Sequence, residues 1–277
     1  MQGAIPQDIK WKDSTRDRSI DRYLSLTRDY WDYDVIIWPE TALPALPENI
    51  PRVISFLTEA AKENNTEVLV GAPTWDSKED KYYNSLLQFG SSIDKYSKRR
   101  LVPYGEYFPG AKYFRSLERF LLIPMSDLSP GKVMKNSFIV RGKQVGTLIC
   151  YEIAFKDVAF SSLPKSNFLV NISNDAWFGD TSAPFQHLQI ARVRALESGR
   201  SIARSTNTGL TVLIDHKGRI IKEGPLFVPT VVTGTITGRT GSTPYVSYGD
   251  APVLLLSIVV IFLFLQKPFR CLIYPND

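Results

Sequence analysis

Cysteine is nearly absent from this sequence of 277 residues, which contains only Cys150 and Cys271. Two cysteines exclude the disulfide framework that stabilises many small secreted domains. Histidine is equally scarce, with only His187 and His216, and no group of cysteines and histidines has the spacing of zinc ligands. No glycine-rich loop of the kind that holds a nucleotide phosphate is present. The sequence therefore predicts neither a metal site nor a bound cofactor.

Strong charge of one sign is also missing. The chain has 33 Lys+Arg against 28 Asp+Glu, a formal net charge of +5. No basic block with interleaved aromatic side chains occurs, so the sequence does not predict a nucleic-acid partner. The weak positive charge leaves two interpretations open. It is either an ordinary soluble surface, or it attracts an anionic lipid surface, where each basic residue contributes about 1 kcal/mol.

No Gly/Ser-rich linker, low-complexity stretch or internal repeat divides the chain, and 44% of its residues are hydrophobic. These features predict one large folded domain, which we place at residues 1–245. No secretory signal peptide opens the sequence. Apolar segments with the period of buried strands alternate with segments of helical period, which predicts an α/β protein with helices covering its sheets. The expected helices are 15–31, 51–64, 153–163 and 184–199. The expected strands are 34–38, 67–72 (ended by Pro73), 84–89, 137–140, 145–149, 168–172, 201–205 and 210–214.

The tripeptide Cys150-Tyr151-Glu152 directly follows the apolar run Val145–Ile149. Such a run is typical of a buried strand, and the polar residues after it are expected where the strand opens into a cleft. A cysteine thiolate attacks acyl carbons well, but its formation needs a base or a cationic neighbour. Cys150 is therefore a candidate nucleophile. A buried structural cysteine is the alternative.

Two other segments offer the groups that a cysteine nucleophile needs. Glu40 follows the apolar strand that ends near Trp38, and a glutamate in this position can act as a general base if burial raises its pKa. A helix-capping or surface glutamate is the alternative. Lys98 lies in the basic run 95–100 and can stabilise an oxyanion. From the residues alone, a solvated basic run is the favoured interpretation of Lys98, and Lys95 is the closest substitute for its role.

The chain resembles the nitrilase, or carbon–nitrogen hydrolase, superfamily in a set of motifs that follow one another in the family's order. The closer resemblance is to one branch, the apolipoprotein N-acyltransferases, which acylate bacterial lipoproteins. The matching segments are Gly3–Gln7, Trp38–Pro44, Leu101–Pro109, Ile149–Glu152, Ile172–Gly179 and Arg204–Gly209.

The resemblance implies a nitrilase-like α-β-β-α sandwich and a Glu-Lys-Cys triad. Glu40 would be the base, Cys150 the nucleophile, and Lys98 the cation that stabilises a tetrahedral oxyanion together with the backbone N–H of Tyr151. Supporting and substrate-binding positions follow by the same resemblance. They are Glu106, Tyr151 and Glu152 as supporting residues, and Asn174, Trp177 and Phe178 as residues that contact the substrate.

The implied function is acyl transfer from a membrane phospholipid, through a cysteine thioester, to the N-terminal amine of a diacylglyceryl-cysteine lipoprotein. Two other functions remain open: a soluble amidase or nitrilase, and an inactive remnant that only binds lipoprotein. A papain-like dyad of Cys150 and His187 is a rival mechanism. It is disfavoured because no papain-like local sequence surrounds Cys150.

The segment Ala251–Leu265 is uncharged and almost wholly apolar. We expect a transmembrane segment at 248–267 and a short cytoplasmic tail at 268–277, because Lys267 and Arg270 follow the apolar run. The catalytic domain would then lie on the periplasmic side of the bacterial inner membrane. A buried core helix is the alternative. The apolar stretch 114–125 is either a membrane-dipping arm or a packed helix.

One departure from the family concerns the N-terminus. Members of the family have a strand immediately before the segment that corresponds to Gly3–Gln7, and a bundle of membrane helices before that strand. Most of the strand and the whole bundle are missing from this sequence. The chain therefore resembles the catalytic portion of a longer enzyme, and a split gene, a disrupted gene or a trimmed sequence would all account for this. One hypothesis is that a separate polypeptide carries the membrane helices and supplies the strand.

Overall fold

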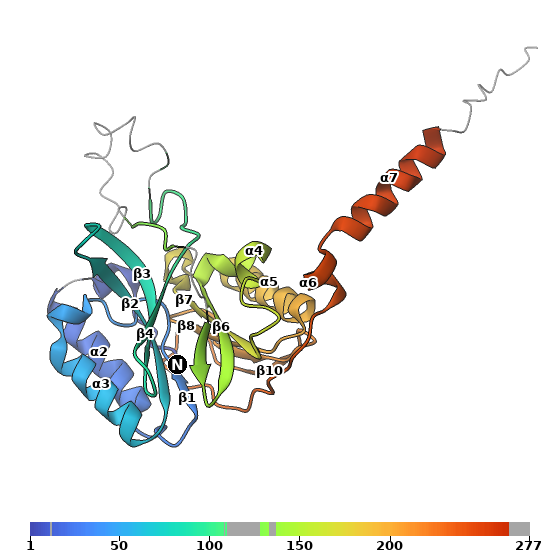
Figure 1. The fold of residues 1–277 in the computed structure, drawn as a ribbon. Coiled ribbons are helices and arrows are strands. Elements are labelled where there is room, and N and C mark those ends of the chain that lie inside the picture. Colours follow the sequence, from blue (N-terminus) through green and yellow to red (C-terminus); the bar gives the residue numbers. More distant parts are fainter. Residues whose placement is uncertain (12, 108, 110–127, 133–136, 266–277) are drawn as a thin grey trace, which may run out of the picture.

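The structure is a computed structural model that describes residues 1–11, 13–107, 109, 128–132 and 137–265. Two sheets pack face to face, and helices cover their outer faces (Figure 1). Buried apolar side chains from both sheets, such as Leu69, Leu86, Val145 and Val170, form the central core between them. The predicted α/β class and the α-β-β-α order of layers are confirmed for the described residues.

The first sheet has the order β1-β2-β3-β4, with β1 parallel to β2 and the other pairs antiparallel. Its outer face is covered by α2 and α3, which bury residues such as Tyr23 and Leu57 against the sheet. The elements are α1 (Gln7–Lys10), α2 (Asp13–Thr27), β1 (Val35–Ile37), η1 (Pro47–Asn49), α3 (Pro51–Glu63), β2 (Glu67–Asp76), β3 (Lys81–Phe89) and β4 (Asp94–Ser97).

The second sheet has the order β10-β9-β8-β7-β6-β5, and its central strands β6, β7 and β8 are parallel. Its outer face is covered by α4 and α5, through residues such as Val158 and Leu188. The elements are β5 (Ser137–Val140), β6 (Lys143–Ile149), η3 (Cys150–Ala154), α4 (Lys156–Ala159), β7 (Phe168–Ser173), η4 (Asp175–Phe178), α5 (Ala183–Ser198), β8 (Ile202–Thr206), β9 (Val212–Ile214) and β10 (Ile220–Glu223).

The parallel strands determine where the site forms. Ile149 on β6 is level with Ile172 on β7, and Ile172 is level with Ser205 on β8. The carboxyl ends of these strands therefore meet at one edge of the sheet, which is where sites form in α/β proteins. The turns η3 and η4 directly follow β6 and β7, so the sequence after Ile149 and the sequence after Ser173 lie next to each other.

Two predictions about local structure were wrong. Pro73 does not end its strand, because β2 continues to Asp76 through antiparallel pairing with β3, while β1 pairs only with Glu67–Leu69. After Leu69, the edge of β2 that faces away from β3 pairs with no strand among the described residues. A proline is tolerated there, because no neighbouring strand needs an N–H from Pro73. The expected helix 153–163 is instead the 3-10 turn η3 followed by the short α4, because Phe155 between them is extended at φ −102° and ψ 113°.

The C-terminal prediction also needs correction. Residues 248–267 do not form one element: α6 (Pro244–Tyr248) and α7 (Ala251–Leu265) are separated at Gly249, whose φ of 57° favours glycine. Among the described residues, no helix has the length and apolar character needed to cross a membrane. A buried core helix is wrong too, because α7 extends away from the domain with no buried residue (Figure 1). The predicted tail 268–277 and the whole apolar stretch 114–125 fall outside the described residues.

Candidate active site

Two carboxylates hold one buried lysine at the carboxyl ends of β1 and β4. The Lys98 Nζ lies 3.1 Å from Glu40 Oε1 and 2.7 Å from Glu106 Oε1, and the Lys98 side chain is only 1% exposed. Asn84 on β3 donates from its Nδ2 to the same oxygens, at 2.7 Å from Glu40 and 3.1 Å from Glu106. The structure thus brings together Glu40, Lys98 and Glu106, which the sequence singled out separately.

Backbone contacts explain why these side chains converge. The N–H of Trp38 donates to Leu69 O at 2.8 Å, which carries the β1–β2 pairing one residue towards Glu40. Lys98 likewise continues the β3–β4 pairing, since its N–H donates to Asn84 O at 2.8 Å. The segment at Glu40 passes directly over Gly71 on β2, where an added Cβ would lie 2.4 Å from the carbonyl oxygen of Pro39. Only glycine permits this close approach.

Cys150 is a free, buried cysteine at the sharp turn from β6 into η3, with φ at 50°. Burial and the nearby Glu40 carboxylate raise the pKa of the Cys150 thiol to about 12, although the Lys98 ammonium lowers it. The resting side chain is therefore the thiol, and a base must take its proton as the sulfur attacks. Glu40, whose charge acts on the thiol, is the candidate for this base. Three hydrogen bonds fix its carboxylate in place: those from Lys98 and Asn84, and one from the N–H of Asn174 at 2.7 Å.

Lys98 keeps its positive charge in this site. Burial disfavours the ammonium, but the charges of Glu40, Cys150 and Glu106 outweigh burial and raise the pKa of Lys98 above its usual value. A permanently charged, fixed ammonium stabilises a developing oxyanion and does not itself exchange protons. Tyr151 adds a second donor of this kind, because its N–H belongs to the first turn of η3, where no partner exists within the helix.

Glu152 connects the turn after Cys150 to the segment at Lys98. Its fully buried carboxylate accepts from the Tyr96 hydroxyl at 2.8 Å, from the Arg99 N–H at 2.6 Å and from the Ile149 N–H at 2.8 Å. Burial raises the pKa of Glu152. These bonds tie β4 to β6, so the predicted supporting position of Glu152 has a clear structural basis. Tyr151 is 38% exposed and packs edge-on against Phe155.

The predicted substrate-binding residues occupy two different environments. Trp177 and Phe178 are 52% and 46% exposed on η4, and can contact a substrate. Asn174 is buried, and its side-chain amide donates to Gln7 Oε1 at 2.8 Å and accepts from Asn207 Nδ2 at 3.0 Å. Its backbone N–H holds Glu40, as described above. Asn174 therefore orders the base, and its contact with a substrate stays a prediction.

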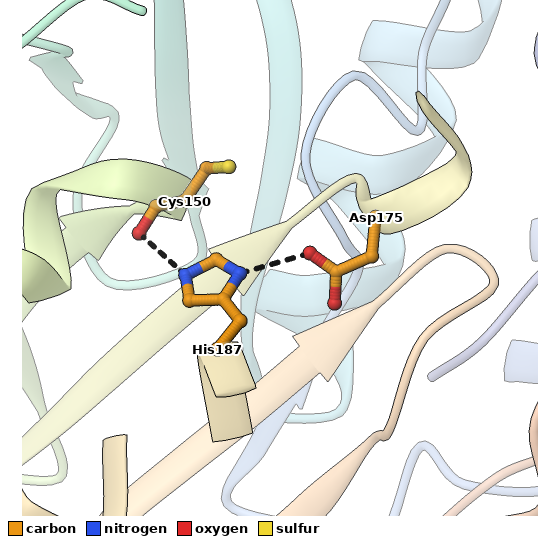
Figure 2. Close-up of side chains that lie close together, drawn as sticks. All are labelled: Cys150, Asp175 and His187. Carbon is orange, nitrogen blue, oxygen red and sulfur yellow. Dashed lines mark hydrogen bonds and ion pairs between the residues drawn. The ribbon is translucent and has the colours of Figure 1, made fainter. Parts of the chain in front are cut away.

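His187 lies beside Cys150 but does not face the sulfur. Its Nε2 lies 3.2 Å from the Cys150 carbonyl oxygen and its Nδ1 lies 3.0 Å from Asp175 Oδ1. Figure 2 shows the Cys150 Sγ pointing away from the imidazole ring. The papain-like dyad therefore lacks its nucleophile–base contact. Asn84, Asp175 and Arg204 were not identified as site residues from the sequence. Asn84 and Arg204 lie within strands, where no local pattern marks a buried polar residue, whereas the position of Asp175 just after β7 was a usable signal.

Cys150, Asp175 and His187 could together offer metal ligands, since one ligand atom of each lies within 4.8 Å of the others. Protein groups already engage these donors. Arg204 Nη2 donates to Asp175 Oδ2 at 2.9 Å, and both imidazole nitrogens contact oxygen atoms. The arrangement therefore favours a hydrogen-bonded chain over a metal centre.

A second buried lysine, Lys10, lies behind the base. Its Nζ donates to the Glu40 carbonyl oxygen at 3.2 Å, and burial lowers its pKa from the ordinary 10.5 to about 7, against the effect of Glu40. Between pH 7 and pH 10.5 the unfolded chain holds the Lys10 proton and the folded chain does not, so the free energy of unfolding rises as the pH rises through this range. Below pH 7 the folded protein must hold a buried ammonium, and the loss of stability is then complete. We expect Lys10→Met to raise the free energy of unfolding at pH 6 by an amount on the order of a few kcal/mol.

Urea denaturation of both proteins at pH 6 and pH 10 checks this prediction. The stabilisation by Lys10→Met should shrink towards pH 10, where the unfolded lysine also begins to lose its proton. The matched control is Lys62→Met, because Lys62 is exposed on α3. If Lys10→Met kept the wild-type pH dependence of stability, the Lys10 amine would not be the cause of the change in stability above pH 7.

Comparisons with known proteins agree with this geometry. Relatives named apolipoprotein N-acyltransferase include one from Photobacterium profundum, 39% identical over 93% of this chain, and one from Vibrio cholerae, 40% identical over 92% of it. A third, from Pseudomonas aeruginosa, is 35% identical over 98% of the chain. The chain spans 52% to 54% of the length of these relatives.

Solved structures show the same fold at low sequence identity. A CN-hydrolase superfamily protein from Xanthomonas campestris aligns with a TM-score of 0.62 and 16% identity, over 98% of this chain and 96% of that one. Nit3 from Saccharomyces cerevisiae, a nitrilase superfamily member, aligns with a TM-score of 0.58 and 19% identity, over 81% and 83%. The family description of carbon–nitrogen hydrolases matches residues 4–245, which include the strands β1 to β10, Lys98 and Cys150. The chain belongs to the carbon–nitrogen hydrolase family.

Proposed function

We propose that this chain is an N-acyltransferase that uses a phospholipid ester as acyl donor. The Cys150 sulfur attacks the ester carbonyl carbon while Glu40 takes the thiol proton. The oxyanion that forms is stabilised by the Lys98 ammonium and the Tyr151 N–H. When the carbonyl re-forms, the C–O bond breaks and Glu40 returns the proton to the leaving glycerol oxygen. The products of this half-reaction are a lysophospholipid and an acyl thioester on Cys150.

In the second half-reaction the acceptor is the N-terminal amine of a diacylglyceryl-cysteine lipoprotein. Its nitrogen attacks the thioester carbon, and Glu40 takes a proton from the nitrogen. The C–S bond then breaks, the sulfur regains a proton from Glu40, and an amide is released. The order of steps is ping-pong, because the acyl group resides on the enzyme between the two substrates.

One observation carries the chemistry of this proposal: a protonated, buried thiol feels the charges of both the Glu40 carboxylate and the Lys98 ammonium, which are paired with each other. The rise of the Cys150 pKa to about 12 through burial and Glu40 makes the base necessary. The lipid and lipoprotein substrates are inferred from the relatives named apolipoprotein N-acyltransferase. The comparisons give no support to a separate membrane polypeptide, and we do not propose one.

The proposed location follows from the substrates and from the apolar C-terminal segment. We place the catalytic domain, residues 1–245, on the periplasmic face of the bacterial inner membrane. The exposed apolar side chains of α7 (Ala251–Leu265) would contact the lipid of that membrane. Trp177 and Phe178 would meet the acyl chain.

A second candidate function is hydrolysis of a small carbon–nitrogen bond, in which water replaces the amine in the second half-reaction. Membership of the carbon–nitrogen hydrolase family favours it, and the same three residues would act. The two functions differ in what the acyl-enzyme reacts with.

An assay with two substrates separates the two functions. The chain is incubated with a phospholipid that carries an alkyne fatty acid and with a diacylglyceryl-cysteine peptide. We expect the alkyne to appear in amide linkage on the peptide, and not on a control peptide with an acetylated N-terminus. Turnover of small amides with no label on the free-amine peptide would contradict the acyltransferase and favour the hydrolase.

A further inference from the structure

Cys150 has an unusual backbone conformation. Its φ of 50° lies in the left-handed region, which costs a residue other than glycine about 1–2 kcal/mol. The conformation arises where β6 turns into η3, and it sets the direction in which the Cβ–Sγ bond leaves the chain. Contacts of the surrounding structure must hold such a residue in place.

Side chains of α5 contact backbone carbonyl oxygens at the start and at the end of η3. Near the start of the helix, His187 Nε2 lies 3.2 Å from the Cys150 carbonyl oxygen. Two helical turns later, Arg194 donates from Nε to Ile153 O at 2.9 Å and from Nη2 to Ala154 O at 2.8 Å. Residues seven apart share one face of a helix, so α5 presents both side chains to the same turn.

The imidazole ring of His187 is itself fixed from behind. Its Nδ1 lies 3.0 Å from Asp175 Oδ1, which also accepts from the Ser173 hydroxyl at 2.8 Å. The other oxygen of Asp175 accepts from Arg204 Nη2 at 2.9 Å, and the side chains of both residues are 0% exposed. Gly209 leaves the space for this pair, because an added Cβ there would lie 2.2 Å from Asp175 Oδ2.

We propose that His187 is a positioning residue for the nucleophile: its Nε2–H holds the Cys150 carbonyl and thereby directs the sulfur towards Glu40 and Lys98. Both oxygens that the ring contacts are acceptors, so the ring donates to both only as the imidazolium ion, whose charge lies against the Asp175 carboxylate. The buried Asp175–Arg204 pair orients the ring through Nδ1. Figure 2 shows this chain from the Cys150 carbonyl through His187 to Asp175. The role rests on the proposed function for its effect on acyl transfer, but the geometry of Cys150 is independent of the substrate. His187 takes no proton from the thiol, because its Nε2 faces the carbonyl oxygen and the Sγ points away.

Two isosteric substitutions separate the two hydrogen bonds of the ring. His187→Gln places an amide N–H near the position of Nε2 and retains the donor to Cys150. His187→Asn places one near Nδ1 and retains only the donor to Asp175, and His187→Ala retains neither. We expect His187→Gln to form the Cys150 thioester at nearly the wild-type rate. His187→Asn and His187→Ala should be slower by about 100-fold, the usual cost of a reacting group that is misplaced by about 1 Å.

Three further measurements keep the test independent of folding and of substrate. Melting temperatures verify that each variant folds, and rates are compared among variants with equal melting temperatures. Alkylation of Cys150 by iodoacetamide should change in the same order as thioester formation, even if the lipid is the wrong donor. Burial lowers the pKa of His187, so the wild-type rate should fall as the pH rises and the ring loses a proton, whereas His187→Gln has no titrating ring and should not show this fall. His216→Gln in the β9–β10 turn is the matched control and should change nothing.

Two results would overturn the assignment. Equal loss of activity in the Gln, Asn and Ala variants would show that a donor at the position of Nε2 does not restore the rate, so that the carbonyl hydrogen bond is not the role of the ring. Wild-type rates of thioester formation and alkylation in all three folded variants would show that the carbonyl needs no donor from α5. A wild-type chain that forms no thioester but shows the expected order of alkylation rates would refute the proposed function alone.

Discussion

Replacing Cys150 with alanine should abolish acyl transfer and leave the fold intact. The reaction has no route to a covalent intermediate without the sulfur, because Glu40 and Lys98 only move a proton and stabilise charge. The thiol makes little contribution to the core beyond its own small volume, so the melting temperature should change little. Release of labelled lysophospholipid and labelling of the amine peptide are the measurements.

Cys150→Ser provides the matched control for shape. A serine hydroxyl occupies nearly the same space and can accept and donate the same hydrogen bonds, but its oxygen holds its proton far more strongly than sulfur. We expect Cys150→Ser to fold as the wild type does and to transfer almost no acyl group. Acyl transfer at an undiminished rate by folded Cys150→Ala would place the nucleophile elsewhere.

Replacing Lys98 with methionine should damage both activity and stability. Removing one oxyanion donor costs about 10²–10³-fold in rate. The substitution also leaves the carboxylates of Glu40 and Glu106 buried without their shared cation, and breaking a buried ion pair costs about 3–5 kcal/mol. The two like charges would raise the pKa of one carboxyl in the folded variant above its value in the unfolded chain, so the loss of stability should be larger at pH 8 than at pH 5.

Lys95→Met is the control for this prediction. Lys95 lies on β4, the strand that Lys98 directly follows, but it is exposed, so its loss should change neither rate nor stability appreciably. Urea denaturation at both pH values and the initial rate of thioester formation are the measurements. A Lys98→Met variant with normal rate and normal stability would remove the lysine from the mechanism, and a defect in Lys95→Met would show that the basic run acts as a whole.

Local sequence patterns indicated two of the three proposed catalytic residues. Cys150 and Glu40 follow apolar runs that became β6 and β1, and a polar residue at the end of a buried strand points to the site edge. Lys98 has no such local pattern. It follows β4, a short strand (Asp94–Ser97) that sequence reasoning did not predict because its residues are mostly polar. Only the family resemblance distinguished Lys98 from Lys95.

The hydrogen bonds that link the Cys150 carbonyl to His187, Asp175 and Arg204 could not be predicted, because they join residues that are far apart in the sequence. His187 was identified as a rival base, and its true partner is a carbonyl oxygen, a group that every residue carries. Arg204 is read as surface charge in most sequences, yet it is fully buried on β8 and compensated by Asp175. The C-terminal region differs from its prediction for a local reason, because Gly249 ends α6 with a positive φ and separates it from α7.

The measurement that tests the account most directly is peptide mapping of the chain after incubation with phospholipid alone. The account predicts one acyl group on the peptide that contains Cys150, in a linkage that neutral hydroxylamine cleaves as it cleaves a thioester. The adduct should form far more slowly in Glu40→Gln. An acyl group on any other residue, or an adduct that hydroxylamine leaves in place, would contradict the assignment of Cys150 as the nucleophile.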